Sequence, residues 1–460
     1  MGNIAAVYDH LRALRKQKTP VQPLRVDDRG HLLVHADGSP FFYLADTAWE
    51  LFHLLTVEEI DVYFKNRREK GFTVIQSVIL SEYDGLRTPN AYGYLPLEDE
   101  DPLHPNEKYF DFVVQVLTLA EENGLYIGLL PTWGDKVDKW HWGIGPEIFT
   151  RENAVDYGAY LGKKLGKHTN IIWILGGDRF PFPHIDLWRA LAHGIRKTEP
   201  QPHLMTYHPI GERSSSTWLH QEPWLTFNML QSGHADRCFD NYSMVLHDYH
   251  LSPPKPCLDG EPRYENHIIN SDPLNGRFDG ADVRSAAYWA VFAGACGHTY
   301  GCNEIWQFYD TSRKPYGAAL CTWQEAMDME GAWSMLHLRN LIESRPGETR
   351  VPDQMLISAC QGSHEHHVQA MRDAASTYAM LYLPAGRPVV PDLTRIEGKV
   401  LRTWWYNPRN GQSTLIGTCS DKSPVSYKPL MEGHGQDWVL VIDSAERNYP
   451  PPGKWEDYVK

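Results

Sequence analysis

The stretch FFYLADTAWELFHLLTVEEIDVYFKNRREKGFTVIQSVIL, residues 41–80, has the pattern of a strand, a helix and a second strand. Both ends are nearly continuous runs of apolar, aromatic and β-branched residues, which are typical of parallel strands buried on both faces. Between them, Thr56 and Glu59 form a capping-box pattern, and Gly71 marks the end of the helix. The stretch therefore predicts one β–α–β unit.

This unit recurs along the first three quarters of the chain. Strand-like runs occupy residues 41–49, 72–80, 125–133, 171–178, 203–209, 224–233, 255–261 and 298–308. Helical patterns follow at 56–71, 108–123, 151–166, 186–198, 236–249, 281–294 and 322–343. Strand and helix alternating eight times predict a (β/α)8 TIM barrel of the α/β class. The Ser-rich residues 210–223 are too short for a good helix, so one outer helix should be stunted.

The pattern changes after about residue 350. Short alternating strands at 377–384, 399–408, 413–419 and 437–443 are separated by Pro, Gly and Asp turns. They predict a small antiparallel β-sandwich. We therefore expect an N-terminal helical extension at 1–23, the barrel at 24–348 and the β-sandwich domain at 349–460.

Composition narrows the class of protein. The 460 residues carry 44 Lys and Arg against 58 Asp and Glu, a net charge of −14, which argues against nucleic acid as a partner of the whole surface. Seven cysteines are spread singly without a CxxC pair, so neither a disulfide framework nor a zinc knuckle is expected. The first 20 residues lack the apolar core of a signal peptide, and no apolar run is long enough for a membrane span. A cytoplasmic protein without membrane partners is predicted.

Polar side chains follow the predicted strands at the edge where a barrel places its chemistry. Asp178 comes directly after the buried run IIWILGG, and Glu261 ends the seventh run, before a proline. Two carboxylates on opposite sides of a barrel mouth are what glycoside hydrolysis requires. Asp259 shares the predicted face of Glu261 and is therefore a second candidate for the catalytic carboxylate at this strand end. We expect it instead to support Glu261 as a neighbouring residue. Glu82 and Asp46 are further acids at the same edge.

The remaining strand-end residues suggest a sugar pocket. The polar residues expected to hold sugar hydroxyls, and the aromatic residues expected to form platforms, are Asp46, Gln76, His208, Gln231, Trp49, Trp133 and Trp306. No strand is followed by a nucleotide-binding glycine motif, so no cofactor is expected. The triplet His364, His366 and His367 falls in the C-terminal region, and no metal site is predicted there or at the barrel mouth.

The chain resembles the apiosidase-like glycoside hydrolases, glycoside hydrolase family 140 and its relatives. The match rests on residues 41–76, on IIWILGGD (171–178) and on LDGEPRYE (258–265). It extends through YLPAGRPV, WWYNPRNG and DWVLVID, which are similar to that family's C-terminal collagen-binding β-domain. The resemblance implies a catalytic barrel in which Asp178 is the general acid/base and Glu261 the nucleophile.

The resemblance also implies an exo-acting, retaining enzyme that removes a terminal apiose-like furanose from plant-derived oligosaccharides or glycosides. Gly177-Asp178 stands where related barrels usually carry Asn-Glu. Two alternatives stay open at this point: a glycosidase of another sugar specificity, and a barrel that binds carbohydrate or protein without catalysis. A small oligosaccharide or glycoside is the expected partner. A homo-oligomer is compatible with the sequence, which indicates no interface.

Overall fold

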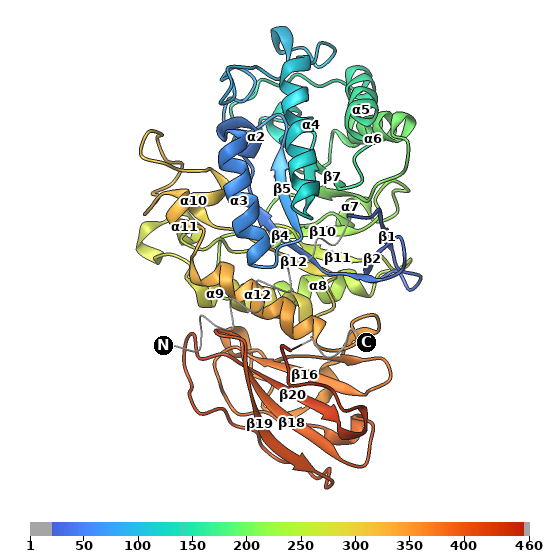
Figure 1. The fold of residues 1–460 in the computed structure, drawn as a ribbon, viewed down its shortest axis with the longest axis vertical. Helices are drawn as coiled ribbons and strands as arrows, with labels where there is room; N and C mark the ends of the chain where they lie inside the picture. Colours follow the sequence, from blue (N-terminus) through green and yellow to red (C-terminus); the bar gives the residue numbers. More distant parts are fainter. Residues whose placement is uncertain (1–20, 141, 455–460) are drawn as a thin grey trace.

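A computed structural model describes residues 21–140 and 142–454. In the described chain, eight parallel strands form the barrel predicted from the sequence (Figure 1). They are β4 (Tyr43–Thr47), β5 (Val74–Val78), β6 (Tyr126–Leu130), β7 (Ile171–Gly176), β8 (Met205–His208), β10 (Asn228–Gln231), β11 (Cys257–Asp259) and β12 (Gly297–Tyr300). The helix expected within residues 1–23 falls almost wholly outside the described residues.

The barrel closes between β8 and β10. The sheet runs in the order β8-β7-β6-β5-β4-β12-β11-β10, and the short β9 (Arg213–Ser214) pairs antiparallel with β10. At the seam, Thr226 N donates to Met205 O at 2.8 Å, and Thr206 Oγ1 donates to Phe227 O at 2.7 Å. Every barrel strand is buried along its whole length, which explains why the strands appear as continuous apolar runs.

Helices cover the outside of the barrel. They are α2 (Leu51–Leu54), α3 (Val57–Glu69), α4 (Glu107–Glu122), α5 (Arg151–Leu165), α6 (Ile185–Thr198), α7 (Ser216–Leu219), α8 (Asn241–Tyr249), α9 (Gly280–Phe292), α10 (Asn303–Trp306), α11 (Trp323–Ala326) and α12 (Glu330–Glu343). The capping box predicted at Thr56 and Glu59 is present. The stunted helix expected between the fifth and sixth strands is the single turn α7, whereas the helix predicted at 322–343 is divided into α11 and α12.

A small antiparallel sheet covers the amino-terminal end of the barrel strands. It contains β1 (Leu24–Val26), β2 (Leu33–His35) and β3 (Pro40–Phe41). Leu33 and Phe41 belong to the same buried cluster as the barrel-interior residues Tyr43 and Ile172. This sheet seals one end of the barrel, so the opposite end, where the strands finish, is left for a binding site.

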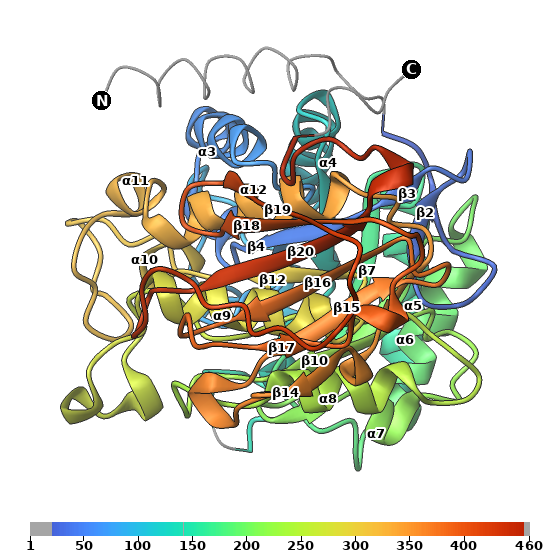
Figure 2. The same ribbon diagram turned by 90° about the horizontal axis from the view of Figure 1, so that it is seen from below.

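The C-terminal residues form the predicted antiparallel β-domain. Its main sheet has the order β13 (Arg350–Pro352), β15 (Gln369–Asp373), β16 (Tyr378–Leu383), β20 (Trp438–Ser444), β18 (Leu401–Asn407) and β19 (Gln412–Cys419). Figure 2 shows these strands lying across the barrel. The second layer of the sandwich is only a two-stranded ribbon, β14 (Ile357–Ala359) with β17 (Val390–Pro391). The inner face packs on α9, where Tyr382 stacks on Tyr288 with ring centroids 4.8 Å apart.

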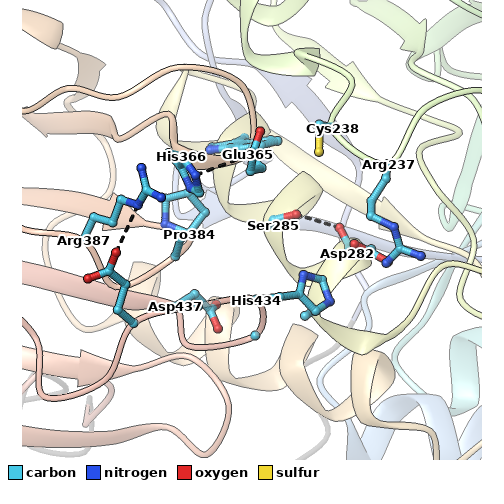
Figure 3. Close-up of a pocket in the computed structure, with 16 residues that line it drawn as sticks. Arg237, Cys238, Asp282, Ser285, Glu365, His366, Pro384, Arg387, His434 and Asp437 are labelled. Carbon is cyan, nitrogen blue, oxygen red and sulfur yellow. Dashed lines mark hydrogen bonds and ion pairs between the residues drawn. The ribbon is translucent and has the colours of Figure 1, made fainter.

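Buried charge also joins the two parts. The Arg284 guanidinium on α9 donates to both carboxylate oxygens of Asp437 at 2.8 Å, and Tyr382 OH donates to the same carboxylate at 3.1 Å. Asp437 also lines a cavity of about 360 Å³ (Figure 3). Its lining includes Arg237 and Asp282 from the barrel and Arg387 from the β-domain.

Breaking the Arg284–Asp437 pair should be costly. Asp437→Ala removes the buried partner of the Arg284 guanidinium and leaves it only the exposed carboxylate of Glu330, at 2.7 Å. We expect the free energy of unfolding to fall by about 3 kcal/mol. Urea unfolding of the full chain measures the change. The exposed pair Arg447–Glu397 is the matched control, because removing Glu397 should leave the midpoint nearly unchanged. Equal midpoints for both variants would contradict this account of the junction.

Two further properties concern the membrane and the cysteines. None of the helices in the described ranges combines the length and the apolar character needed to cross a membrane. All seven cysteines fall in those ranges, and each is a free thiol. The cytoplasmic location and the domain boundaries at residues 23 and 348 stay predictions.

Candidate active site

The turn after β7 is built to bring Asp178 over the barrel mouth. Gly176 and Gly177 have φ values of 90° and 105°, and Asp178 follows with a φ of 60°. A Cβ on Gly176 would lie 2.4 Å from His208 O, and one on Gly177 would lie 2.9 Å from the Trp133 ring. Only glycine fits these two positions, and Asp is among the residues that tolerate the left-handed region. The backbone of this turn sets the direction in which the Asp178 side chain leaves the chain.

Asp178 sits in an environment that favours its protonated form. Its side chain is half-buried, and Oδ1 is inaccessible and has no hydrogen-bond partner in the described structure. Burial and the neighbouring charge of Glu261 raise the pKa of Asp178 to about 6, although a hydrogen bond from Gln231 opposes the shift. A carboxylic acid that keeps its proton in weakly acidic solution can act as a general acid.

Glu261, which follows β11, has the opposite environment. His208 Nε2 lies 3.0 Å from Oε2, and His234 Nε2 lies 3.0 Å from Oε1. Because the Asp178 backbone N–H points at His208 Nδ1 at 3.3 Å, the ring proton of neutral His208 belongs on Nε2, facing Glu261. Burial alone would raise the pKa of Glu261, but contacts with the two histidines outweigh it and lower this pKa to about 2.

The two carboxyl groups face one another at close range. One oxygen of Asp178, one oxygen of Glu261 and a ring nitrogen of His208 all lie within 4.8 Å of each other. The environments push the two pKa values apart, which is the arrangement that separates an acid from an ionised partner. A protonated acid beside a carboxylate can protonate a leaving oxygen while the second group attacks carbon.

Aromatic rings form the floor beneath this pair. Trp49 and Trp133 are buried, with ring centroids 5.2 Å apart, and the His208 ring lies 5.5 Å from Trp49 and 5.7 Å from Trp133. Gln231, at the end of β10, faces Asp178. The structure thus brings together Asp178, Glu261 and four of the residues predicted to bind substrate. Their roles stay predictions.

Trp306 reaches the mouth by a different route from the one expected. The sequence predicts residues 298–308 as one strand, but β12 ends at Tyr300 and Trp306 lies in the helical turn α10. Its ring is half-buried and lies 5.5 Å from Tyr83, which itself stacks on Tyr316 with centroids 3.2 Å apart. These three rings form a wall between the loops that follow β5 and β12.

Asp46 and Gln76 do not join the cluster. Asp46 is fully buried and accepts hydrogen bonds from Arg67 and Tyr63 of α3. Its side chain therefore holds that helix against the barrel. Gln76 is buried inside the barrel, where its amide donates to Gly260 O at 3.0 Å. It therefore supports the segment that carries Glu261. A strand-end position alone does not say which face a side chain takes.

Asp259, the second candidate beside Glu261, has both carboxylate oxygens in hydrogen bonds with neighbouring residues. It accepts hydrogen bonds from the Ser232 hydroxyl at 2.8 Å and from Asn241 Nδ2 at 2.9 Å. His234 and Tyr264 both lie beside Glu261 and were not predicted from the sequence. His234 follows the sixth strand in the short run QSGH, so its position at a polar strand end could have identified it.

Glu82 faces the same cluster, where burial and the charge of Asp178 raise the pKa of Glu82 well above the ordinary value.

Asp178, His208 and Glu261 are also the donor types that bind divalent cations, and their spacing allows it. The histidine proton assignment places a proton on His208 Nε2, which lies 3.0 Å from Glu261 Oε2, and a protonated ring nitrogen has no lone pair for a cation. Acid catalysis by the carboxyl pair requires no metal ion. Activity measured with and without a chelator therefore distinguishes acid catalysis from metal binding by these three side chains.

Comparison with known proteins shows the family of the chain. The family model described as "Apiosidase-like, catalytic domain" matches residues 27–348. The chain belongs to this apiosidase-like family. In this apiosidase-like protein, residues 351–443 also match the model described as "Putative collagen-binding domain of a collagenase". A search of curated proteins finds no match.

Solved structures place the apiosidase-like protein among glycoside hydrolases. One similar structure is a glycoside hydrolase family 5 protein from Bacteroides vulgatus ATCC 8482, 31% identical, with a TM-score of 0.86 over 94% of this chain and 95% of its own. A second, described as a glycoside hydrolase, is 31% identical, with a TM-score of 0.85 over 92% of this chain and 97% of its own. The apiosidase-like protein is therefore a glycoside hydrolase with a carbohydrate substrate.

Proposed function

We propose that this enzyme is an exo-acting, retaining glycosidase that uses Asp178 as the general acid/base and Glu261 as the nucleophile. The observation that carries the proposal is the close approach of the two carboxyl groups, in which one oxygen of Asp178 lies within 4.8 Å of one oxygen of Glu261. Retaining enzymes hold their carboxyl groups about 5–5.5 Å apart, whereas inverting enzymes need about 6.5–9.5 Å to fit a water molecule between group and sugar.

Each step uses the side chains already described. Glu261, ionised and held by His208 and His234, attacks the anomeric carbon while Asp178 gives its proton to the leaving oxygen. The C–O bond to the leaving group breaks as the bond to Glu261 forms. Asp178, now ionised, takes a proton from water, which attacks the same carbon and releases Glu261. Both faces of the sugar are used once, so the configuration is retained.

The buried position of the pair supports action on a chain end. Asp178 Oδ1 and Glu261 Oε2 are inaccessible to solvent, and rings from several loops surround them. A terminal sugar can enter a deep site more readily than the interior of a chain. The family's description supports apiose, a furanose, as that sugar. We propose plant-derived oligosaccharides or glycosides as the substrate class.

A hydrolysis screen tests the proposal. Wild type would be incubated with aryl glycosides and plant oligosaccharides that include β-D-apiosides, with and without EDTA. Release of apiose that EDTA does not reduce is the expected result. Release of another sugar would overturn the apiose assignment but keep the reaction, and loss of activity with EDTA would indicate a metal at Asp178, His208 and Glu261.

The pH profile follows from the two pKa shifts. Because Asp178 acts while protonated, kcat/KM should fall about tenfold per pH unit above the Asp178 pKa of about 6. Glu261 must be ionised, and its pKa of about 2 places the loss on the acid side near pH 2. Initial rates on a methyl glycoside between pH 4 and 9 measure the loss above pH 6, and no acid-side loss is expected within this range. A rate that rises above pH 6 would contradict the assignment of Asp178.

A further inference from the structure

An exposed group of aromatic residues lies beside the proposed acid. We call Trp140, Phe180, Phe182 and Trp218 the aromatic ridge. Trp140 is 60% exposed, and Phe182, two residues beyond Phe180 on the same loop, is 52% exposed. Phe180 and Trp218 are half-buried. The Phe180 ring lies 5.9 Å from Trp140 and packs edge-on against Trp218 at 5.5 Å. Large rings gathered at an open surface commonly mark a binding site.

The ridge is tied to the Asp178 loop by one buried side chain. Arg179 is 3% exposed, and its guanidinium donates to Asp178 O at 2.9 Å, to Asp138 O at 2.6 Å and to Trp142 O. It therefore joins the loop after β6, which carries Trp140, to the loop after β7, which carries Asp178 and Phe180. Trp218 belongs to α7, which follows β8. The ridge spans three neighbouring loops at the mouth.

The side of the mouth on which the ridge lies decides what it can contact. Asp178 follows β7, and Glu261 follows β11, with β8 and β10 between them in the barrel. A general acid protonates the oxygen of the leaving group, so the leaving group must lie on the Asp178 side. Phe180 is two residues from Asp178, and Trp140 packs on Phe180. The ridge is thus next to the departing half of the substrate.

Resting on the proposed function, we propose that the aromatic ridge binds the leaving group of the glycoside and selects leaving groups that contain a ring with a flat apolar face. Sugar rings and aromatic rings both present such a face to an aromatic side chain. A methyl leaving group is too small to reach Trp140 or Phe182. The ridge should therefore contribute to rate and binding only when the leaving group contains a ring.

The test compares leaving groups on one terminal sugar. Methyl β-D-apioside, phenyl β-D-apioside and a disaccharide with terminal β-linked apiose would be assayed with wild type, Trp140→Ala and Phe182→Ala. We expect kcat/KM for a ring-bearing substrate to fall about tenfold in each variant and kcat/KM for the methyl glycoside to stay unchanged. Loss on the disaccharide alone would identify a sugar-ring site, and loss on the phenyl glycoside alone an aromatic-ring site. Leu430→Ala, an exposed apolar change in the β-domain, is the control.

Binding without turnover separates this proposal from the proposed function. The same compounds would be titrated by calorimetry into Glu261→Gln and into the double variants with Trp140→Ala or Phe182→Ala. A Kd that rises about tenfold only for ring-bearing compounds supports the ridge even if wild type hydrolyses none of them. Equal Kd changes for methyl and ring-bearing compounds, or no change for either, would overturn it.

Discussion

Glu261→Gln is expected to lower kcat by about 10⁴-fold or more on every glycoside that the enzyme hydrolyses. Gln has nearly the same shape as Glu but has no negative charge, so it cannot form the covalent bond to the anomeric carbon. The amide can still contact His208 and His234, which should keep the fold intact. Steady-state rates on methyl and aryl glycosides measure the loss, and KM separates it from weaker binding.

Glu265→Gln is the matched control for this substitution. Glu265 lies four residues further along the same segment, but its carboxylate accepts hydrogen bonds from Tyr300 OH at 2.6 Å and Gly331 N at 3.0 Å, away from the cluster. Its rate should stay near wild type. A Glu261→Gln enzyme with more than about a tenth of wild-type kcat would contradict the nucleophile assignment and direct attention to Asp259 and Glu82.

Asp178→Asn is expected to have an effect that depends on the leaving group. For a methyl glycoside, which needs a proton on its departing oxygen, kcat/KM should fall by about 10²–10⁴-fold. For a 2,4-dinitrophenyl glycoside, whose leaving group departs as a stable anion, the first step should proceed at close to its wild-type rate. The loss of activity above pH 6 should also disappear, because the group that titrates there is gone.

Glu82→Gln is the informative comparison for the acid. Glu82 is a second carboxyl group at the mouth whose pKa burial and the Asp178 charge raise, so it could serve as the proton donor if Asp178 does not. A leaving-group dependence in Glu82→Gln combined with none in Asp178→Asn would transfer the acid role to Glu82. A uniform loss on both kinds of glycoside in Asp178→Asn would contradict acid catalysis by this residue.

The barrel was predictable because its determinants are local. Strands buried on both faces must be apolar throughout, and the helix signals at Thr56, Glu59 and Gly71 lie within one short stretch. The division between α11 and α12 and the turn α10 after β12 were not predicted, because both regions are apolar enough to extend the preceding pattern. The two strands that form the second layer of the β-domain, β14 and β17, are also too short to give a recognisable sequence pattern.

The site was only partly predictable. Asp178 and Glu261 follow apolar strands, and the rule that barrel chemistry lies at strand ends was enough to name them as candidates. The same rule named Asp46 and Gln76, but one faces α3 and the other faces the barrel interior. The contacts from His208 and His234 to Glu261 join residues far apart in sequence, and only the three-dimensional structure brings them together.

The stereochemical course of hydrolysis tests the central claim most directly. Proton NMR of the first sugar released by wild type, recorded before the anomers equilibrate, gives the configuration of the product. The approach of Asp178 and Glu261 to within 4.8 Å predicts the same anomeric configuration as in the substrate. Release of the opposite anomer would require a water molecule between Glu261 and the sugar, and would contradict the proposed nucleophile.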